Sequence, residues 1–430
     1  MQCYKEWATR RELFYISFYA MKTITTTAEL AEACTHFADH PYVTVDTEFL
    51  RETTYWPKLC LIQMAGPDDA VLIDPLAEGL DLAPFFALMA DTSIVKVFHA
   101  GRQDIEIIYH LGNLIPAPMF DSQVAAMVCG FGDSISYDQL VMRLTGARLD
   151  KSHRYTDWSR RPLTEKQLTY ALADVTHLRD VYHALRANLE EQKRSEWVQE
   201  EMEILTSPET YYTEPSRAWK RMKLRIRKPK EFAALKELAA WRESEAQARD
   251  VPRNRVLKDE AIFELAIQQP QTQEALSALR STSKGYERSK SGHDLLQVMQ
   301  KVAKIPVEDL PDVPKGKTQP EGSGAAVDLM KVLLKLTSER HGVAAKVIAT
   351  VDDLEKIACD DDADVAALKG WRRELFGQYA IKVKTGEMAL RLEGKRVATI
   401  ECEAPEIPEK KQAAKRRKKP RVSQNGTSQG

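Results

Sequence analysis

Four acidic side chains and one tyrosine in the first half of the sequence are of types that could together form a divalent metal centre. Asp46-Thr47-Glu48 carries two carboxylates at positions i and i+2, Asp104 follows later in the chain, and Tyr170 stands four residues before Asp174. Carboxylates that meet within a few ångströms repel one another unless cations lie between them. Hard oxygen ligands of this kind suit Mg²⁺ or Mn²⁺. The set therefore predicts a metal centre, provided that the fold brings its members together.

Each of these patterns has an ordinary structural interpretation when it is taken alone. Two acids on a strand can face solvent, and an Asp early in a helix, such as Asp104, can complement the helix dipole. The spacing Tyr-x-x-x-Asp is common on surface helices. His99 ends an apolar strand, so we expect a core residue or a neighbour of the ligands rather than a metal ligand. The combination and order of the patterns carry the prediction.

The chemistry-bearing residues fall within segments whose periodicity predicts regular structure. Val43 and Val45 alternate with Asp46 and Glu48, so the two acids share one face of a strand. Thr164 predicts an N-cap with Gln167 completing a capping box, and the helix that follows places Tyr170 and Asp174 one turn apart on one face.

Strands and helices alternate between residue 21 and about residue 181, which predicts an α/β layer architecture. The expected strands are Tyr42–Phe49, Leu59–Ala65, Ala70–Asp74 and Ile94–His99. The expected helices run from Thr26 to Phe37, Gly101 to Leu111, Gln123 to Cys129, Tyr137 to Leu144, and Thr164 to beyond Leu189.

The five residues in this order resemble the tyrosine branch of the DEDD exonuclease superfamily. Phe120-Asp121-Ser122-Gln123 and Thr156-Asp157-Trp158 are similar to intervening segments of the ribonuclease D family. The resemblance implies a ribonuclease H-like mixed sheet in the exonuclease domain. One departure is Arg102-Gln103 before Asp104, where the family pattern has a small residue and an acid.

The resemblance also implies a mechanism with two ions about 4 Å apart. Asp46 would bridge both ions, Glu48 and Asp174 would hold the ion that activates water, and Asp104 would support the other. Tyr170 would orient the attacking water. The implied reaction is 3′→5′ hydrolysis of RNA ends to nucleoside 5′-monophosphates, with transfer-RNA precursors and other structured small RNAs as substrates.

Strand patterns largely disappear after about residue 190. Trp241-Arg242 and the stretch from Val251 to Leu257 are similar to the helical HRDC module, and a second helical unit resembles a divergent copy. We expect an extension at residues 1–20, untranslated or disordered, and an exonuclease domain at 21–205. An HRDC domain is expected at 209–300, a linker at 301–326, a second HRDC-like domain at 327–402, with helix to Leu392 and a strand at Val397–Glu401, and a basic disordered tail at 403–430.

Positive charge is concentrated locally although the net charge is only −1. Concentrated positive charge suits a polyanion, because counterion release supplies binding free energy. A solvated helix face is the alternative interpretation, and the tail could serve solubility instead. The predicted nucleic-acid-binding residues are Arg217, Lys220, Arg221, Lys223, Arg225, Arg227 and Lys228.

Composition excludes several other classes of protein. The 6 cysteines include no C-x-x-C pair, which argues against a disulfide framework or a zinc site and favours a reducing, cytoplasmic location. No apolar run approaches the roughly 20 residues of a membrane helix, and the resemblance suggests a monomer. A DNA exonuclease and a catalytically silent nucleic-acid-binding scaffold remain as competing functions.

Overall fold

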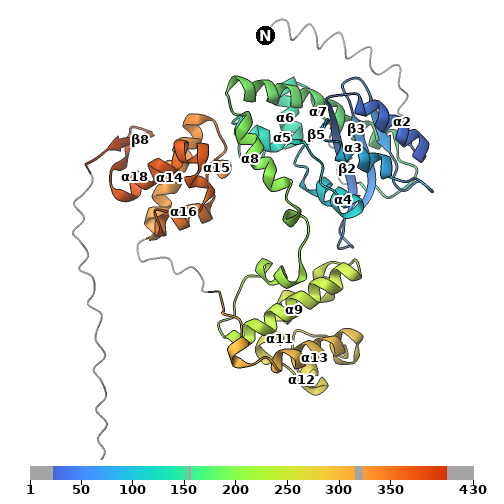
Figure 1. The fold of residues 1–430 in the computed structure, drawn as a ribbon, viewed down its shortest axis with the longest axis vertical. Helices are drawn as coiled ribbons and strands as arrows, with labels where there is room; N and C mark the ends of the chain where they lie inside the picture. The colour runs from blue at the N-terminus through green and yellow to red at the C-terminus, as the bar shows by residue number, and fades with distance from the viewer. Residues whose placement is uncertain (1–22, 151, 154–155, 315–322, 404–430) are drawn as a thin grey trace, which may run out of the picture.

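The computed structural model describes residues 23–150, 152–153, 156–314 and 323–403, which form three bodies (Figure 1). We call them the α/β domain (β1 to α8), the first helical domain (η3 to α13) and the second helical domain (α14 to β8). The expected extension at residues 1–20 and all but the first residue of the expected tail lie outside the described residues. No helix in the described part of the chain is long and apolar enough to cross a membrane.

A six-stranded mixed sheet forms the centre of the α/β domain, with the strand order β1-β4-β3-β2-β5-β6. The central strand β2 pairs antiparallel with β3 and parallel with β5, so it lies inside the sheet with neighbours on both sides. The strands are β1 (Thr23–Ile24), β2 (Tyr42–Leu50), β3 (Lys58–Ala65), β4 (Ala70–Ile73), β5 (Val95–Phe98) and β6 (Met119–Asp121). The predicted α/β class and the four predicted strands are confirmed, and the short strands β1 and β6 were missed.

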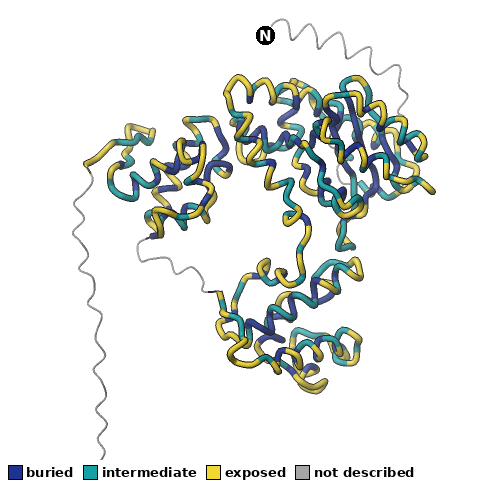
Figure 2. Tube along the Cα trace, viewed as in Figure 1, coloured by how far each residue is buried: buried dark blue, intermediate teal, exposed yellow. Residues whose placement is uncertain are grey.

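Helices cover the sheet, and the long helix α7 packs against β2, β3 and β4. Its start has the predicted geometry, because the Thr164 hydroxyl accepts from the Gln167 backbone N–H and the Gln167 side chain accepts from the Thr164 backbone. Figure 2 shows the buried residues concentrated in the sheet and its covering helices. The helices are α2 (Thr27–Ala38), α3 (Ala83–Ala90), α4 (Arg102–Gly112), α5 (Ser122–Val128), α6 (Tyr137–Thr145), α7 (Glu165–Glu191) and α8 (Ser195–Leu205).

The first helical domain has a hydrophobic core of its own, separate from that of the α/β domain. The stretch at residues 217–228, which we call the basic segment, lies on this core. Only its beginning is helical, because the 3-10 helix η3 ends at Arg221 and residues 222–228 form neither helix nor strand. The helices are η3 (Pro215–Arg221), α9 (Pro229–Ala248), α10 (Arg253–Val256), α11 (Asp259–Gln268), α12 (Gln273–Ser277) and α13 (Lys290–Ala303).

The second helical domain ends in a β-hairpin, which corrects the expectation of helix as far as Leu392. β7 (Met388–Glu393) pairs antiparallel with β8 (Arg396–Glu401), and the turn between them contains Gly394 at φ +63°. A glycine that adopts positive φ between two short strands is a hairpin signal. The preceding helices are α14 (Ser323–His341), α15 (Ala345–Ile348), α16 (Val351–Cys359), α17 (Gly370–Arg372), the π-helical turn η7 (Arg373–Gly377) and α18 (Gln378–Thr385).

The second helical domain docks firmly on the α/β domain, and Figure 1 shows α15 beside α8. The rings of Trp197 on α8 and Trp371 on α17 stack with centroids 4.2 Å apart and planes 7° apart. Arg372, almost fully buried, forms ion pairs with the neighbouring Glu200, at 2.5 Å, and Glu201. Buried residues of both domains belong to one continuous hydrophobic cluster.

Candidate active site

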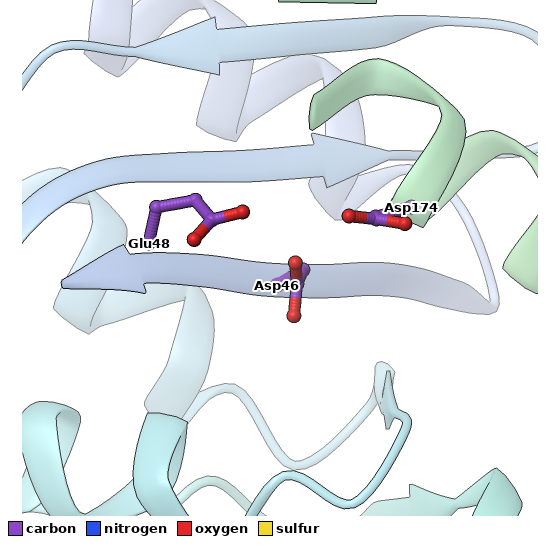
Figure 3. Close-up of side chains that lie close together, drawn as sticks. All are labelled: Asp46, Glu48 and Asp174. Carbon is purple, nitrogen blue, oxygen red and sulfur yellow. The ribbon is translucent and has the colours of Figure 1, made fainter. Parts of the chain in front are cut away.

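Three of the predicted acids meet where the second half of β2 faces α7 (Figure 3). Asp46 and Glu48 project from the same face of β2, and Asp174 approaches from α7. One carboxylate oxygen from each residue lies within 4.8 Å of the others. The hydroxyl of Thr44 fixes this arrangement, because it donates to the backbone carbonyl of Val175 over 2.9 Å and ties α7 to β2 beside the acids.

The fourth acid, Asp104, lies in the first turn of α4 and is only 6% exposed. It is not one of the three clustered carboxylates, but it stands close enough for its charge to raise the pKa of Asp46. The hydroxyl of Thr47 donates to a carboxylate oxygen of Asp104. Thr47 therefore reaches the fourth acid from the opposite face of β2, a role that the alternation pattern alone did not assign to it.

Burial and mutual repulsion disfavour negative charge at this site. Burial raises the pKa of Asp46 well above its ordinary value, and the charges of Asp104, Asp174 and Glu48 raise it further. Burial raises the pKa of Asp104 to about 6, although the hydrogen bond from Thr47 opposes the shift. Without a cation these acids retain protons at a pH where an exposed Asp is ionised.

Tyr170 lies one turn before Asp174 on α7 and is hydrogen-bonded to it. Burial raises the pKa of the Tyr170 phenol, and the charges of Asp174 and Glu48 raise it further. The phenol therefore stays protonated and acts as a hydrogen-bond donor rather than as a base. The buried Trp158 ring packs beside the Tyr170 ring, with the two ring centroids 6.1 Å apart.

Asp46, Glu48 and Asp174 open into a cavity of about 760 Å³ whose other walls combine aromatic and apolar side chains with polar and charged ones. His99 lines this cavity, and its Nδ1 lies 2.9 Å from the Ser122 hydroxyl. Burial lowers the pKa of His99, which favours the neutral imidazole, and His99 is not one of the three residues whose ligand atoms cluster. Tyr137, which sequence reasoning did not single out, lies beside His99 with its hydroxyl on the Ala173 carbonyl at 3.2 Å.

Comparison with known proteins identifies the family. A family model described as "3'-5' exonuclease" matches residues 21–190, and one described as "HRDC domain" matches residues 231–299. The "Ribonuclease D" of Nitrobacter hamburgensis is 59% identical over 89% of this chain and 100% of its own length. The chain belongs to the ribonuclease D family.

Further comparisons support this assignment along most of the chain. The "Ribonuclease D" of Bartonella henselae is 50% identical over 88% of this chain and 94% of its own length. The crystal structure of Escherichia coli RNase D, described as "an exoribonuclease involved in structured RNA processing", matches with a TM-score of 0.76 and 30% identity. That match covers 85% of this chain and 98% of the other. This ribonuclease D family member is thus a 3′→5′ exoribonuclease, and its family implies the use of divalent metal ions.

The departure from the ribonuclease D pattern before Asp104 has a local structural role. Gln103 accepts a hydrogen bond from Arg51 over 3.0 Å, and Arg51 also lies 3.3 Å from Glu106. Arg102 donates to the Thr210 carbonyl over 3.3 Å. Arg102 and Gln103 therefore connect α4 to neighbouring segments. Arg51 is a basic side chain in the wall of a cavity whose other charged residues are acids.

The seven basic side chains of the basic segment are all exposed, but they do not form a helix face. Met222 and Ile226 are buried in the first helical core, and Lys223, Arg225 and Arg227 alternate with the apolar residues. Residues 222–228 therefore do not form the helix face that was the alternative interpretation. Two members have acidic partners, Arg217 with Glu209 and Glu214, and Lys228 with Glu231.

The raised pKa of Asp104 predicts that the protein without metal ions becomes less stable as the pH rises. Bound metal ions should remove this loss of stability. Between its ordinary value of 3.8 and the folded value of about 6, the folded protein binds more protons than the unfolded protein. Stability should therefore fall as the pH rises through this range in a chelator. Asp104→Asn keeps an acceptor for Thr47 and carries no charge. It should raise the unfolding temperature at pH 7.5 and change it much less at pH 4.

Thermal unfolding in the presence of chelator, followed by circular dichroism, measures this effect. Saturating Mg²⁺ should stabilise the wild-type protein and remove the advantage of Asp104→Asn at pH 7.5. An equal shift at both pH values would show that the charge of Asp104 is not the cause.

Proposed function

We propose that this chain removes nucleotides one at a time from the 3′ ends of structured RNAs, transfer-RNA precursors among them, and releases nucleoside 5′-monophosphates. The observation that carries this proposal is the meeting of Asp46, Glu48 and Asp174 in one open cavity. The E. coli relative, whose printed description names structured RNA processing, supports the class of substrate.

We propose two divalent ions, Mg²⁺ or Mn²⁺, as the cofactors. The site fits them, since its clustered ligand atoms are all carboxylate oxygens and burial shifts Asp46 and Asp104 toward the protonated form in the absence of a cation. Asp46, whose pKa is raised by Asp104 as well as by Asp174 and Glu48, would contact both ions. Bound divalent ions would polarise a phosphoryl oxygen and lower the pKa of the attacking water.

The remaining groups bind and orient the substrate. Tyr170, protonated and hydrogen-bonded to Asp174, would orient the attacking water through its hydroxyl oxygen. Tyr137 and His99 form an apolar and aromatic wall against which the terminal nucleotide can stack. Asp46, Glu48, Asp104, Tyr170 and Asp174 are thus proposed as the catalytic set, with the four acids as metal ligands.

We propose that the helical part of the chain binds RNA at a distance from the cavity. The basic segment presents Arg217, Lys220, Arg221, Lys223, Arg225, Arg227 and Lys228 toward solvent. Contacts between these side chains and phosphates would add affinity without reading the sequence.

The domain boundaries of the sequence prediction are retained as part of this proposal. They comprise an exonuclease domain at 21–205, HRDC-type domains at 209–300 and 327–402, a linker at 301–326, and flanking segments at 1–20 and 403–430. A monomeric protein acting in the cytoplasm is consistent with this organisation.

Replacing Asp46 tests the proposed chemistry most simply. Asp46→Asn removes the charge placed between the two sides of the site, so Mg²⁺-dependent release of mononucleotides from an RNA oligomer should fall by at least about 100-fold. RNA binding, measured by fluorescence anisotropy, should remain within about twofold, since the basic segment is unchanged.

The exposed Glu78 provides a matched control, because Glu78→Gln also neutralises one acid and should leave activity unchanged. A DNA oligomer of the same sequence, assayed in parallel, separates ribonuclease from deoxyribonuclease activity. Retention of more than a few per cent of activity by Asp46→Asn would contradict the role given to Asp46.

The basic segment can be tested by the salt dependence of binding. The double variant Lys223→Gln with Arg227→Gln removes two exposed charges and keeps the buried Met222 and Ile226. Its affinity for a folded RNA should fall, and the slope of log K against log salt should decrease in magnitude by about 1 to 2. Lys331→Gln with Lys335→Gln, both exposed on α14, is the control. Equal slopes for both variants would show that the basic segment is not part of the RNA-binding surface.

A further inference from the structure

The loop between β2 and β3, residues 51–57, connects the catalytic strand to the first helical domain. The Tyr55 hydroxyl donates to the carboxylate of Glu243 on α9. The same hydroxyl accepts from Arg253 over 2.8 Å and from Gln247 over 3.2 Å. The guanidinium of Arg253 also lies over the Tyr55 ring, 4.6 Å from its centroid. One side chain of the α/β domain thus enters a polar network of the helical domain.

Backbone contacts reinforce this network. The backbone N–H groups of Tyr55 and Trp56 both donate to Asp250, at 3.0 Å and 2.9 Å. Asp250 adopts φ +47° just past the end of α9, a conformation that Asp and Asn tolerate better than most residues. The Trp56 ring stacks on His110 of α4 with centroids 4.0 Å apart. The loop is therefore held at once by α9 and by α4, the helix that carries Asp104.

The acid in this network makes the contact energetically significant. Glu243 is 1% exposed and receives two hydrogen bonds from Arg253, each 2.6 Å long. A buried carboxylate that loses a hydrogen-bond donor is left partly unsatisfied, and hydrogen bonds to charged groups stabilise more than those between neutral groups. Burial raises the pKa of Tyr55 to about 12, so the phenol keeps its proton at physiological pH.

The chain segment that joins the α/β domain to the first helical domain would by itself let the two domains rotate relative to each other. The contact at Tyr55 opposes this rotation. Tyr211 packs on the α/β domain, with its ring 6.2 Å from that of Tyr109. Only two residues later, the Thr213 carbonyl accepts from Gln247 of the first helical domain over 2.9 Å. A single chain crossing between two separate cores permits swivelling, whereas a second, distant attachment fixes the orientation.

We propose that the contacts between residues 51–57 and residues 243–253, which we call the Tyr55 joint, set the selectivity of the enzyme for structured RNA. The joint holds the basic segment at a fixed position relative to the carboxylates at the end of β2. A folded RNA bound to the basic segment then delivers its 3′ end to the cavity, while a short oligomer needs only the cavity. This inference rests on the proposed function.

Tyr55→Ala and Tyr55→Phe, with Tyr212→Phe as the control, test the joint in the full chain. Tyr212 is 45% exposed in the interdomain segment, and its replacement removes the same hydroxyl outside the joint. The specificity constant kcat/KM is measured for a hairpin RNA with a single-stranded 3′ end and for a short single-stranded RNA. Tyr55→Ala should lower kcat/KM about tenfold for the hairpin and less than twofold for the short RNA, and Tyr55→Phe should show a smaller loss of the same selectivity.

Small-angle X-ray scattering without RNA provides an independent readout. Tyr55→Ala should increase the radius of gyration, and Tyr212→Phe should not. Asp250→Asn, which retains the tolerated backbone conformation and weakens the acceptor, takes the place of Tyr55→Ala should that variant fail to fold.

Two results would contradict the proposed role of the Tyr55 joint. One is an equal loss on both RNAs in an active Tyr55 variant, and the other is scattering identical to wild type. Failure of the wild-type enzyme to degrade either RNA would instead refute the proposed function, and the scattering comparison would still decide whether the joint exists.

Discussion

Repulsion between carboxylates that are buried together is the constraint on which the rest of this structure depends. Asp46 has its pKa raised by burial and by three acidic neighbours, so the fold holds these residues where their charges are unfavourable. Secondary structure supplies the necessary rigidity. β2 is hydrogen-bonded on both sides, and the hydroxyl of Thr44 joins it to α7 beside Asp174. Divalent cations bound among these carboxylates would relieve the repulsion.

The three bodies of the molecule differ in how strongly they are coupled to this centre. The second helical domain shares a continuous hydrophobic cluster with the α/β domain through the stacked pair Trp197 and Trp371. The first helical domain has a separate core and meets the α/β domain through a polar contact at Tyr55. Polar contacts between domains are easier to break than a shared core. The first helical domain, which carries the basic segment, is therefore the part whose position depends on individual hydrogen bonds.

Local sequence signals predicted the elements that carry the acids, because those signals act over a few residues. Alternation defined β2, and the capping box at Thr164 defined the start of α7. The very short strands β1 and β6 escaped prediction, since three residues or fewer carry no measurable period. The hairpin β7–β8 was mistaken for helix at its first strand, although Gly394 marked its turn.

Features that depend on tertiary contacts could not be predicted from local sequence signals. The alternation in β2 placed Thr47 among apolar residues, and only the position of α4 shows that its hydroxyl reaches Asp104. The basic segment had a solvated helix face as its alternative interpretation. Its alternation of buried Met222 and Ile226 with exposed cations becomes meaningful only once the helical core beneath it is known. The partners of Tyr55 lie almost two hundred residues away along the chain.

A crystal structure of the protein with Mn²⁺ and a nucleoside 5′-monophosphate tests the central claim most directly. Anomalous scattering locates manganese independently of the protein atoms. The account predicts one peak among Asp46, Glu48 and Asp174 and a second between Asp46 and Asp104, each within roughly 2 to 2.5 Å of carboxylate oxygens. The absence of manganese next to Asp46, with the nucleotide bound elsewhere, would contradict it.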